Sequence, residues 1–363
     1  MPGALQSCEP PTAPSLLTHR IAHVIYIRDF FRIAPSNNDH HPAIRCAIGV
    51  GVPLLTLLAI GRIDLAIFAV IGAFTGVYGR GQIHRVRFSQ QWRAGVLLLL
   101  SVMAGLTASH LGLEAGALVG CTAVVGALGF LATRFRRLSP DGSLFYVFGF
   151  SAIAFMATPA PVVPALTVAG ASVLLSLCVG VAGRMLPGHR TPWEKERHVR
   201  LLDRERRETY IQTVMHIAAI AISGAIVIQL GFGHSYWAMI AATSALVGAT
   251  AGHRIARGVH RILGMFAGLV ITGVLLGMHL ADWQMVLVVI VLQFLVELFV
   301  ARHYALAQAF VTPLALLMTE VARPENPWAL MTARGVETVI GVSVGMAIVI
   351  FAHGIHALRS APE

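Results

Sequence analysis

Charged residues are scarce in this chain. Only 12% of its 363 residues are Asp, Glu, Lys or Arg, and 56% are hydrophobic. Soluble domains carry about 25% charged and about 45–50% hydrophobic residues. So few charges cannot solvate the surface of a globule of this length. The composition therefore excludes a soluble protein and predicts an integral membrane protein surrounded by the lipid bilayer.

Catalytic and metal-binding motifs are missing as well. The sequence contains no hydrolase, kinase or dinucleotide-binding motif. Its 4 cysteines, Cys8, Cys46, Cys121 and Cys178, are scattered without metal or redox spacing. Its 16 histidines include no pair at helical spacing that is joined by a carboxylate. We therefore expect no enzyme, no metal and no other cofactor.

A cleaved signal peptide is not expected. Residues 1–14 are rich in proline and lack an apolar core after a basic start. Residues 15–33 alternate Leu, Ile, Val and Phe with His and Arg, a pattern typical of a helix lying in the membrane interface. Residues 1–42 are therefore predicted to form a cytoplasmic arm with an interfacial helix.

Long apolar runs are what the sequence has instead. Such runs can cross the ~30 Å hydrocarbon core of a bilayer as helices. Twelve candidates lie at 44–60, 65–79, 95–111, 114–132, 143–158, 162–183, 213–230, 236–251, 264–279, 283–301, 304–319 and 334–352. They predict an all-α integral membrane protein with twelve transmembrane helices.

The basic residues are sorted by position along these runs. If both termini are cytoplasmic, 24 of the 27 Lys and Arg residues fall in the arm, the cytoplasmic connections or the tail. Only Arg62, Arg323 and Arg334 fall on the other side. Because the positive-inside rule places Lys and Arg in cytoplasmic loops, we expect a multi-pass protein with both termini in the cytoplasm.

One basic stretch, from His253 to Gly264, places Arg254, Arg257 and Arg261 on a single helical face. No aromatic platform interleaves these charges, so no nucleic-acid partner is expected. The arginines can reach headgroup phosphates. Together with Arg45 they can also attract anions to an inner mouth through their summed field. Membrane topology explains the same residues, and both interpretations stay open.

The chain repeats itself. Residues 64–76 align with 236–248, with Ala and Gly residues in register. Each half contains six runs, and because six is even, the halves share one orientation across the membrane. We predict two parallel six-helix repeats at 43–185 and 213–353, a basic cytoplasmic linker at 186–212 and a cytoplasmic tail at 354–363.

The second run of each half is short and carries small residues one turn apart. Gly72 and Gly76 lie in the first of these runs, and Ser244 and Gly248 in the second. Short, Gly-interrupted helices at matching positions are typical of a transporter's central site. Close helix packing explains such stripes too and is the simpler account.

Four motifs of the second half carry a family resemblance. They are Tyr236-Trp237-Ala-Met, Arg261-Ile-Leu-Gly264-Met-Phe-Ala-Gly268, the run from Tyr304 to Thr312-Pro313, and Arg334-Gly-Val-Glu337-Thr-Val-Ile-Gly341. This set resembles the signature of the fusaric-acid-resistance-like superfamily, whose bacterial members include aromatic acid exporters. The resemblance covers 210–352 well and 43–185 loosely.

The resemblance implies proton-coupled export of small organic, often aromatic, carboxylate anions across a bacterial plasma (inner) membrane. The superfamily also resembles plant aluminium-activated malate transporters, so a passive organic-anion channel stays open. A non-transporting membrane scaffold or assembly factor is the alternative of another class. Long exporters of the superfamily carry a large soluble domain and work with a periplasmic adaptor. The short linker here puts an adaptor in doubt, and a homo-oligomer stays open.

Few residues suit the chemistry of such a transporter. An exported carboxylate needs a positive or amide-rich stop, and proton coupling needs a carboxylate or an imidazole that titrates in low-dielectric surroundings. Glu297, with Gln293 one turn away, is the first candidate for the substrate or proton pathway. The alternative is a helix-end carboxylate paired with Arg302.

Further pathway candidates lie in the same half. Glu337 follows Arg334 by one turn, and a structural ion pair is the simpler account of the two. His216 can shuttle protons near neutral pH, or it is an interfacial group. Thr312, in the Tyr304 motif, completes the candidates.

Overall fold

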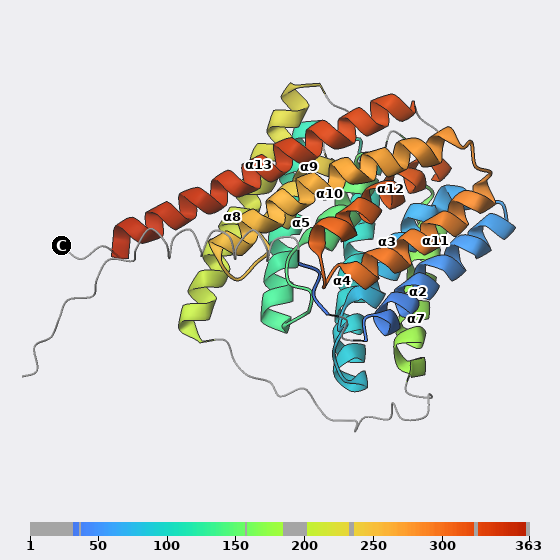
Figure 1. Ribbon diagram of the computed structural model, residues 1–363, viewed down its shortest axis with the longest axis horizontal. Helices are drawn as coiled ribbons and strands as arrows, with labels where there is room; N and C mark the ends of the chain where they lie inside the picture. The colour runs from blue at the N-terminus through green and yellow to red at the C-terminus, as the bar shows by residue number, and fades with distance from the viewer. Residues whose placement is uncertain are drawn as a thin grey trace, which may run out of the picture.

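The computed structural model describes residues 32–35, 38–156, 158–183, 202–231, 236–322 and 326–360, and these form helices joined by turns (Figure 1). The elements are α2 (His40–Ala59), η1 (Ile63–Leu65), α3 (Ala66–Ala73), η2 (Phe74–Val77), α4 (His84–His110), α5 (Ala115–Arg136), α6 (Leu144–Ala154), α7 (Val162–Ala182), α8 (Asp203–Gln229), α9 (Tyr236–Ala245), α10 (Ala251–Gly277), α11 (Asp282–Phe299), α12 (Tyr304–Ala322) and α13 (Pro327–Ser360). The predicted arm up to residue 31 and most of the linker lie outside the described residues.

Eight helices are long and apolar enough to cross a membrane. They are α2, α4, α5, α7, α8 from Glu205, α10, α11 and α13 up to Gly354. Every predicted run contains a helix, but the segments Ile63–Val77 and Leu144–Ala154 are shorter, and α9 has only 10 residues. The chain is therefore an all-helical, multi-pass membrane protein with eight candidate spans in its described part.

Two helix boundaries differ from those expected. α8 begins at Asp203, inside the segment 186–212 that we expected to be a linker. Its first turn carries Asp203 and Glu205, which suit the positive end of a helix dipole. α13 continues to Ser360 and therefore includes most of the expected tail. Its 34 residues carry it well beyond the other helices (Figure 1).

The long helices present large apolar side chains on their outer faces. Leu128 on α5, Leu174 on α7 and Val270 on α10 are 61%, 60% and 70% exposed. Lipid tails are as apolar as leucine, so such faces need no protein cover in a bilayer. Their exposure agrees with a membrane protein whose outer surface contacts lipid.

The short helices are the most deeply enclosed. All residues of α9 are buried, as are all residues of α3 except Ile67. Interrupted helices are tolerated at membrane depth when protein surrounds them, because their unpaired backbone groups then avoid lipid. α3 and α9 therefore occupy the interior, where a full-length span is not needed.

Small residues allow these interior helices to pack closely. A Cβ atom on Gly72 would overlap the carbonyl oxygen of Ala169 on α7. A Cβ atom on Gly341 of α13 would likewise overlap the carbonyl oxygen of Ala238 on α9. Close packing is therefore sufficient to explain the small residues at Gly72 and Gly341.

Corresponding helices of the two halves have corresponding neighbours. In the first half α2 packs on α3 and α7, α3 packs on α7, and α4 packs on α6 and α7. In the second half α8 packs on α9 and α13, α9 packs on α13, and α10 packs on α12 and α13. Contacts between the halves are reciprocal, since α11 packs on α2 and α5 packs on α8.

Candidate functional site

Buried polar and aromatic side chains gather between α9, α10, α12 and α13. Arg334 on α13 is 1% exposed, and Glu337, one turn further, is 0% exposed. The guanidinium carbon of Arg334 lies 3.9 Å from the centroid of the Trp237 ring on α9. We call the residues Trp237, Arg261, Tyr304, Gln308, Arg334 and Glu337 the arginine–aromatic cluster.

Arg261 brings a second cation into this cluster from α10. The side chain is buried, and its Nη1 donates to the hydroxyl of Tyr304 at 3.3 Å and to Oε1 of Gln308 at 3.4 Å. Both partners lie on α12, one turn apart. A close crossing permits these contacts, because Gly264 of α10 packs against the backbone of α12 at Ala305.

The predicted basic face of α10 makes its contacts inside the protein. Besides buried Arg261, Arg257 lies over the Tyr304 ring, 3.7 Å from its centroid. Arg254 donates from Nε to the carbonyl oxygen of Gly248 at 2.9 Å. Arg261 is buried, whereas Arg254 and Arg257 are half-buried. Topology explained these residues from sequence, but it did not reveal their partners.

The cations of the arginine–aromatic cluster outnumber its acidic group. Arg334 has Arg261 as a like-charged neighbour and Glu337 as an opposite one. The Nε and Nη1 atoms of Arg334 have no hydrogen-bond partner in the described part of the chain. A buried donor left unpaired costs about 1–3 kcal/mol. A carboxylate oxygen could accept a charge-assisted hydrogen bond from either of these donors.

Aromatic side chains lie on one side of the Arg334 guanidinium. Trp237 lies 4.7 Å from Tyr236, centroid to centroid, and stacks on Phe148 of α6 at 5.9 Å. The indole Nε1 has no hydrogen-bond partner among the residues that the structure describes. An anion that also carries an aromatic ring fits such surroundings chemically.

Two further predicted site residues lie next to this cluster. The Thr312 hydroxyl donates to the carbonyl oxygen of Gln308 at 3.1 Å and packs against Gly268 of α10. Ser244 on α9 donates to the carbonyl oxygen of Ala241 at 2.7 Å and lies beside Tyr304. Both hydroxyls are buried and face α10 or α12, so the structure brings them together with the arginines.

A second polar cluster lies where α11 meets α2 and the turn before α4. Arg80 donates from Nη1 to Oε2 of Glu297 at 2.9 Å and from Nη2 to Oδ1 of Asp39 at 3.1 Å. Its Nη2 also donates to the main-chain oxygen of Glu297. Arg45 donates from Nη2 to the carbonyl oxygen of Arg80 at 3.4 Å. We call Asp39, Arg45, Arg80 and Glu297 the Arg80 cluster.

The alternative interpretation, in which Glu297 pairs with Arg302, is wrong. Glu297 pairs with Arg80, which lies 217 positions earlier in the chain, whereas Arg302 donates from Nε to the carbonyl oxygen of Ala34 at 2.9 Å. Gln293 is buried one turn before Glu297. No spacing in the sequence pointed to Arg80, because only the packing of α11 on α2 brings the two side chains together.

His216 and Gly76 lie outside the arginine–aromatic cluster. His216 is buried on α8, where its ring stacks on Phe130 of α5 at 4.2 Å and Nδ1 lies 2.8 Å from the carbonyl oxygen of Gln212. His216 is therefore enclosed by protein, and both its proton-shuttle and its interfacial interpretation stay predictions. Gly76 lies against Cys46 of α2 and Ser176 of α7, so it serves packing near the Arg80 cluster.

Arg62, which was expected on the non-cytoplasmic face of the membrane, forms an ion pair. Arg62 follows α2 and donates from Nε to Oδ1 of Asp64 at 3.0 Å. This hydrogen bond, with the neighbouring negative charge, raises the pKa of Arg62. The pair is exposed, so its contribution to stability is small.

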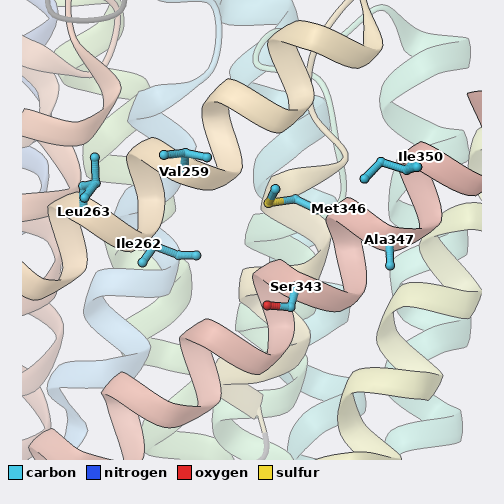
Figure 2. A pocket seen from close by; sticks show the side chains of 7 residues that line it. All are labelled: Val259, Ile262, Leu263, Ser343, Met346, Ala347 and Ile350. Carbon is cyan, nitrogen blue, oxygen red and sulfur yellow. The ribbon is translucent and has the colours of Figure 1, made fainter.

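An apolar groove of about 380 Å³ lies between α10 and α13 (Figure 2). Its lining residues are Val259, Ile262, Leu263, Ser343, Met346, Ala347 and Ile350. Leu263 and Ile350 are 48% and 57% exposed, so the groove opens on the outer surface. Its lining has no charged group, so the groove suits an apolar ligand such as a lipid chain.

Two comparisons with known proteins found matches to part of the chain. Residues 217–348 match a family model described as fusaric acid resistance protein-like. The uncharacterized membrane protein YvaC of Bacillus subtilis (strain 168) is 28% identical over 120 residues. The match covers 33% of this chain but only 19% of that relative. No solved structure matches. The matched stretch, residues 217–348, holds the arginine–aromatic cluster and Glu297, and over this stretch the chain is similar to the fusaric acid resistance protein-like family.

Proposed function

We propose that this protein is a transporter that exports small organic carboxylate anions, aromatic ones in particular, across a bacterial inner membrane. The observation that carries the proposal is buried Arg334, whose Nε and Nη1 have no hydrogen-bond partner among the described residues. A substrate carboxylate would pair with this guanidinium, while the substrate ring would contact Trp237 and its aromatic neighbours.

The charge balance supports an anionic substrate. Arg257, Arg261 and Arg334 lie around Tyr304 and Trp237, and Glu337 is the acidic residue of the arginine–aromatic cluster. An uncompensated cation in low-dielectric surroundings attracts an anion strongly. A neutral or cationic substrate would leave that charge unmatched.

The arrangement of helices supports a transporter architecture. We propose twelve crossings in two parallel six-helix repeats, since corresponding helices have corresponding neighbours. Gly61 and Gly231 follow α2 and α8 with φ angles of 68° and 77°, so equivalent helices end in the same left-handed geometry. Transporters built from repeats place their substrate beside interrupted central helices. The arginine–aromatic cluster borders α9, one of the two interrupted helices.

Transport into liposomes tests the proposal. Purified full-length protein is reconstituted, a pH gradient is imposed, and uptake of labelled benzoate is followed. Because neutral benzoic acid crosses bilayers unaided, only accumulation beyond that in protein-free liposomes under the same pH gradient supports a proton-coupled transporter. Flux that only dissipates the benzoate gradient supports the channel alternative, and absence of flux from well-folded, inserted protein supports a scaffold.

A matched pair of variants links transport to the proposed site. Arg334→Gln removes the guanidinium, and Ser343→Ala changes α13 at the outer groove, away from the arginine–aromatic cluster. Arg334→Gln should abolish benzoate flux, and Ser343→Ala should retain it. Equal flux through both variants would remove the basis of the proposal.

A further inference from the structure

The ion pair between Arg80 and Glu297 resembles an occupied anion site. The Glu297 side chain is 5% exposed and that of Arg80 is 20% exposed. The Arg80 side chain is therefore partly exposed, while the Glu297 carboxylate that it contacts is enclosed. Arg80 already binds two carboxylates, Asp39 and Glu297, which is the chemistry that a carboxylate substrate requires.

Other charged and titratable groups face this ion pair from α2 and α4. Asp39, Arg45 and Cys46 lie beside the ion pair on the α2 side, and Arg87 of α4 lies near Arg45 and contacts His84. The Nε atoms of Arg45 and Arg87 have no hydrogen-bond partner in the described part of the chain. Arg45, Arg80 and Arg87 carry one positive charge more than Asp39 and Glu297 can balance. Protonation of Glu297 would raise this excess to two.

Helix packing alone does not require a carboxylate at this place. The contact between α5 and α8 corresponds to the one between α11 and α2. There the ring of Phe130 stacks on His216 at 4.2 Å. An aromatic stack thus fills the contact between α5 and α8. The contact between α11 and α2 instead holds a buried ion pair, whose desolvation is costly. This difference indicates that Glu297 has a function other than helix packing.

We propose that Arg80, with Arg45 beside it, is a second binding station for the transported carboxylate, and that Glu297 occupies this station until it is protonated. The inference rests on the proposed function and extends it to a second site. A proton that binds a Glu297 oxygen removes its negative charge and weakens its bond to Arg80. The substrate carboxylate then takes the place of Glu297 at the guanidinium.

The exchange links one proton to one carboxylate. An O–H bond forms on Glu297, the Glu297 contact to Arg80 breaks, and a substrate contact replaces it. No other bond changes. Carboxylate binding at this station should therefore take up a proton and strengthen as the pH falls. The gain is at most about tenfold per pH unit, because only one proton is linked.

Isothermal titration with benzoate tests this exchange. The purified full-length protein carries Arg334→Gln, which removes the first proposed carboxylate site, and titrations are run between pH 6 and pH 8 in buffers of different ionisation enthalpy. We expect proton uptake on benzoate binding and an affinity that rises toward pH 6. Additional Glu297→Gln should abolish the proton uptake and make the affinity independent of pH. Additional Arg80→Gln should abolish binding.

Two outcomes separate this inference from the proposed function. Suppose that Arg334→Gln stops transport, but that Glu297→Gln leaves the proton uptake and the pH dependence of binding as in its parent. The second binding station is then wrong, whereas the proposed transport function is retained. If Arg80→Gln fails to fold, Arg80→Lys replaces it, since lysine keeps the charge but loses the bidentate fork. If the Arg80→Lys variant binds benzoate as tightly as its parent does, the proposal of a second binding station is also wrong. Arg302→Gln is the matched control and should bind as its parent does.

Discussion

The guanidinium of Arg334 lies over the indole ring of Trp237, 3.9 Å from its centroid, and both side chains are buried. One group provides charge and hydrogen-bond donors, and the other provides an apolar face. A contact of this kind is worth about 2 kcal/mol or more when it is desolvated. It also holds the guanidinium in one orientation, which prepares it for a carboxylate.

Arg334→Gln should weaken benzoate binding at least about tenfold, because a hydrogen bond to a charged group contributes ~1.5–3 kcal/mol. Arg334→Lys should lie between Arg334→Gln and the parent, since it keeps the charge without the fork. A benzoate-dependent thermal shift of each purified variant measures the effect. Ser343→Ala is the control variant. If benzoate raises the unfolding temperature of Arg334→Gln as much as it raises that of the control, Arg334 is not part of the site.

Trp237→Leu should reduce selectivity for aromatic acids more than it reduces carboxylate binding itself. Leucine keeps an apolar surface but removes the ring–ring contact, which is worth ~0.5–1.5 kcal/mol. The ratio of benzoate to butyrate affinity should therefore fall about two- to tenfold. Competition by both acids against labelled benzoate gives this ratio. A ratio that does not move would show that the substrate ring lies away from Trp237.

Gly341→Ala should destabilise the protein by about 1–3 kcal/mol, because overpacking forces backbone shifts and the added Cβ would overlap the carbonyl oxygen of Ala238. Gly116→Ala is the matched control, since a Cβ at Gly116 meets nothing within 4 Å. Thermal unfolding in one detergent compares the two variants with the parent. Similar unfolding temperatures for both would mean that the α9–α13 crossing adapts to the extra atom.

The membrane orientation can be tested with cysteines at exposed helix ends. Gln82 and Arg137 lie at the end predicted to be cytoplasmic, and Glu114 and Asp282 lie at the opposite end. In a background without native cysteines, an impermeant thiol reagent applied to intact cells should label positions 114 and 282. Positions 82 and 137 should react only after the membrane is opened. The reverse pattern would invert the topology.

Local patterns in the sequence predicted the helices well, because apolar composition depends on neighbouring residues only. They could not show which runs are full spans, since α3 and α9 are shortened by enclosure that depends on the whole fold. Arg334 was a candidate site residue because it lies one turn before Glu337, although a structural ion pair was the simpler account. Its contact with Trp237 was not predicted, because this contact requires the crossing of α13 over α9.

Arg80 shows the limit of such reasoning most clearly. In sequence it is one of several arginines in a basic connection, and topology gave a sufficient reason for all of them. Its two ion pairs form only because α11 lies on α2 and the turn before α4 reaches both helices. Spacing along one helix cannot reveal partners that lie in opposite halves of the chain.

The reciprocal contacts of α11 with α2 and of α5 with α8 also constrain the order of assembly. α2 is made early, but the helix that covers one of its faces is made only after most of the chain has left the ribosome. Until then Arg80 and Asp39 lack Glu297, and α2 presents an unfinished face to lipid or to a chaperone. Neither half can therefore complete its structure alone, and insertion of α11 is the step that closes the first half.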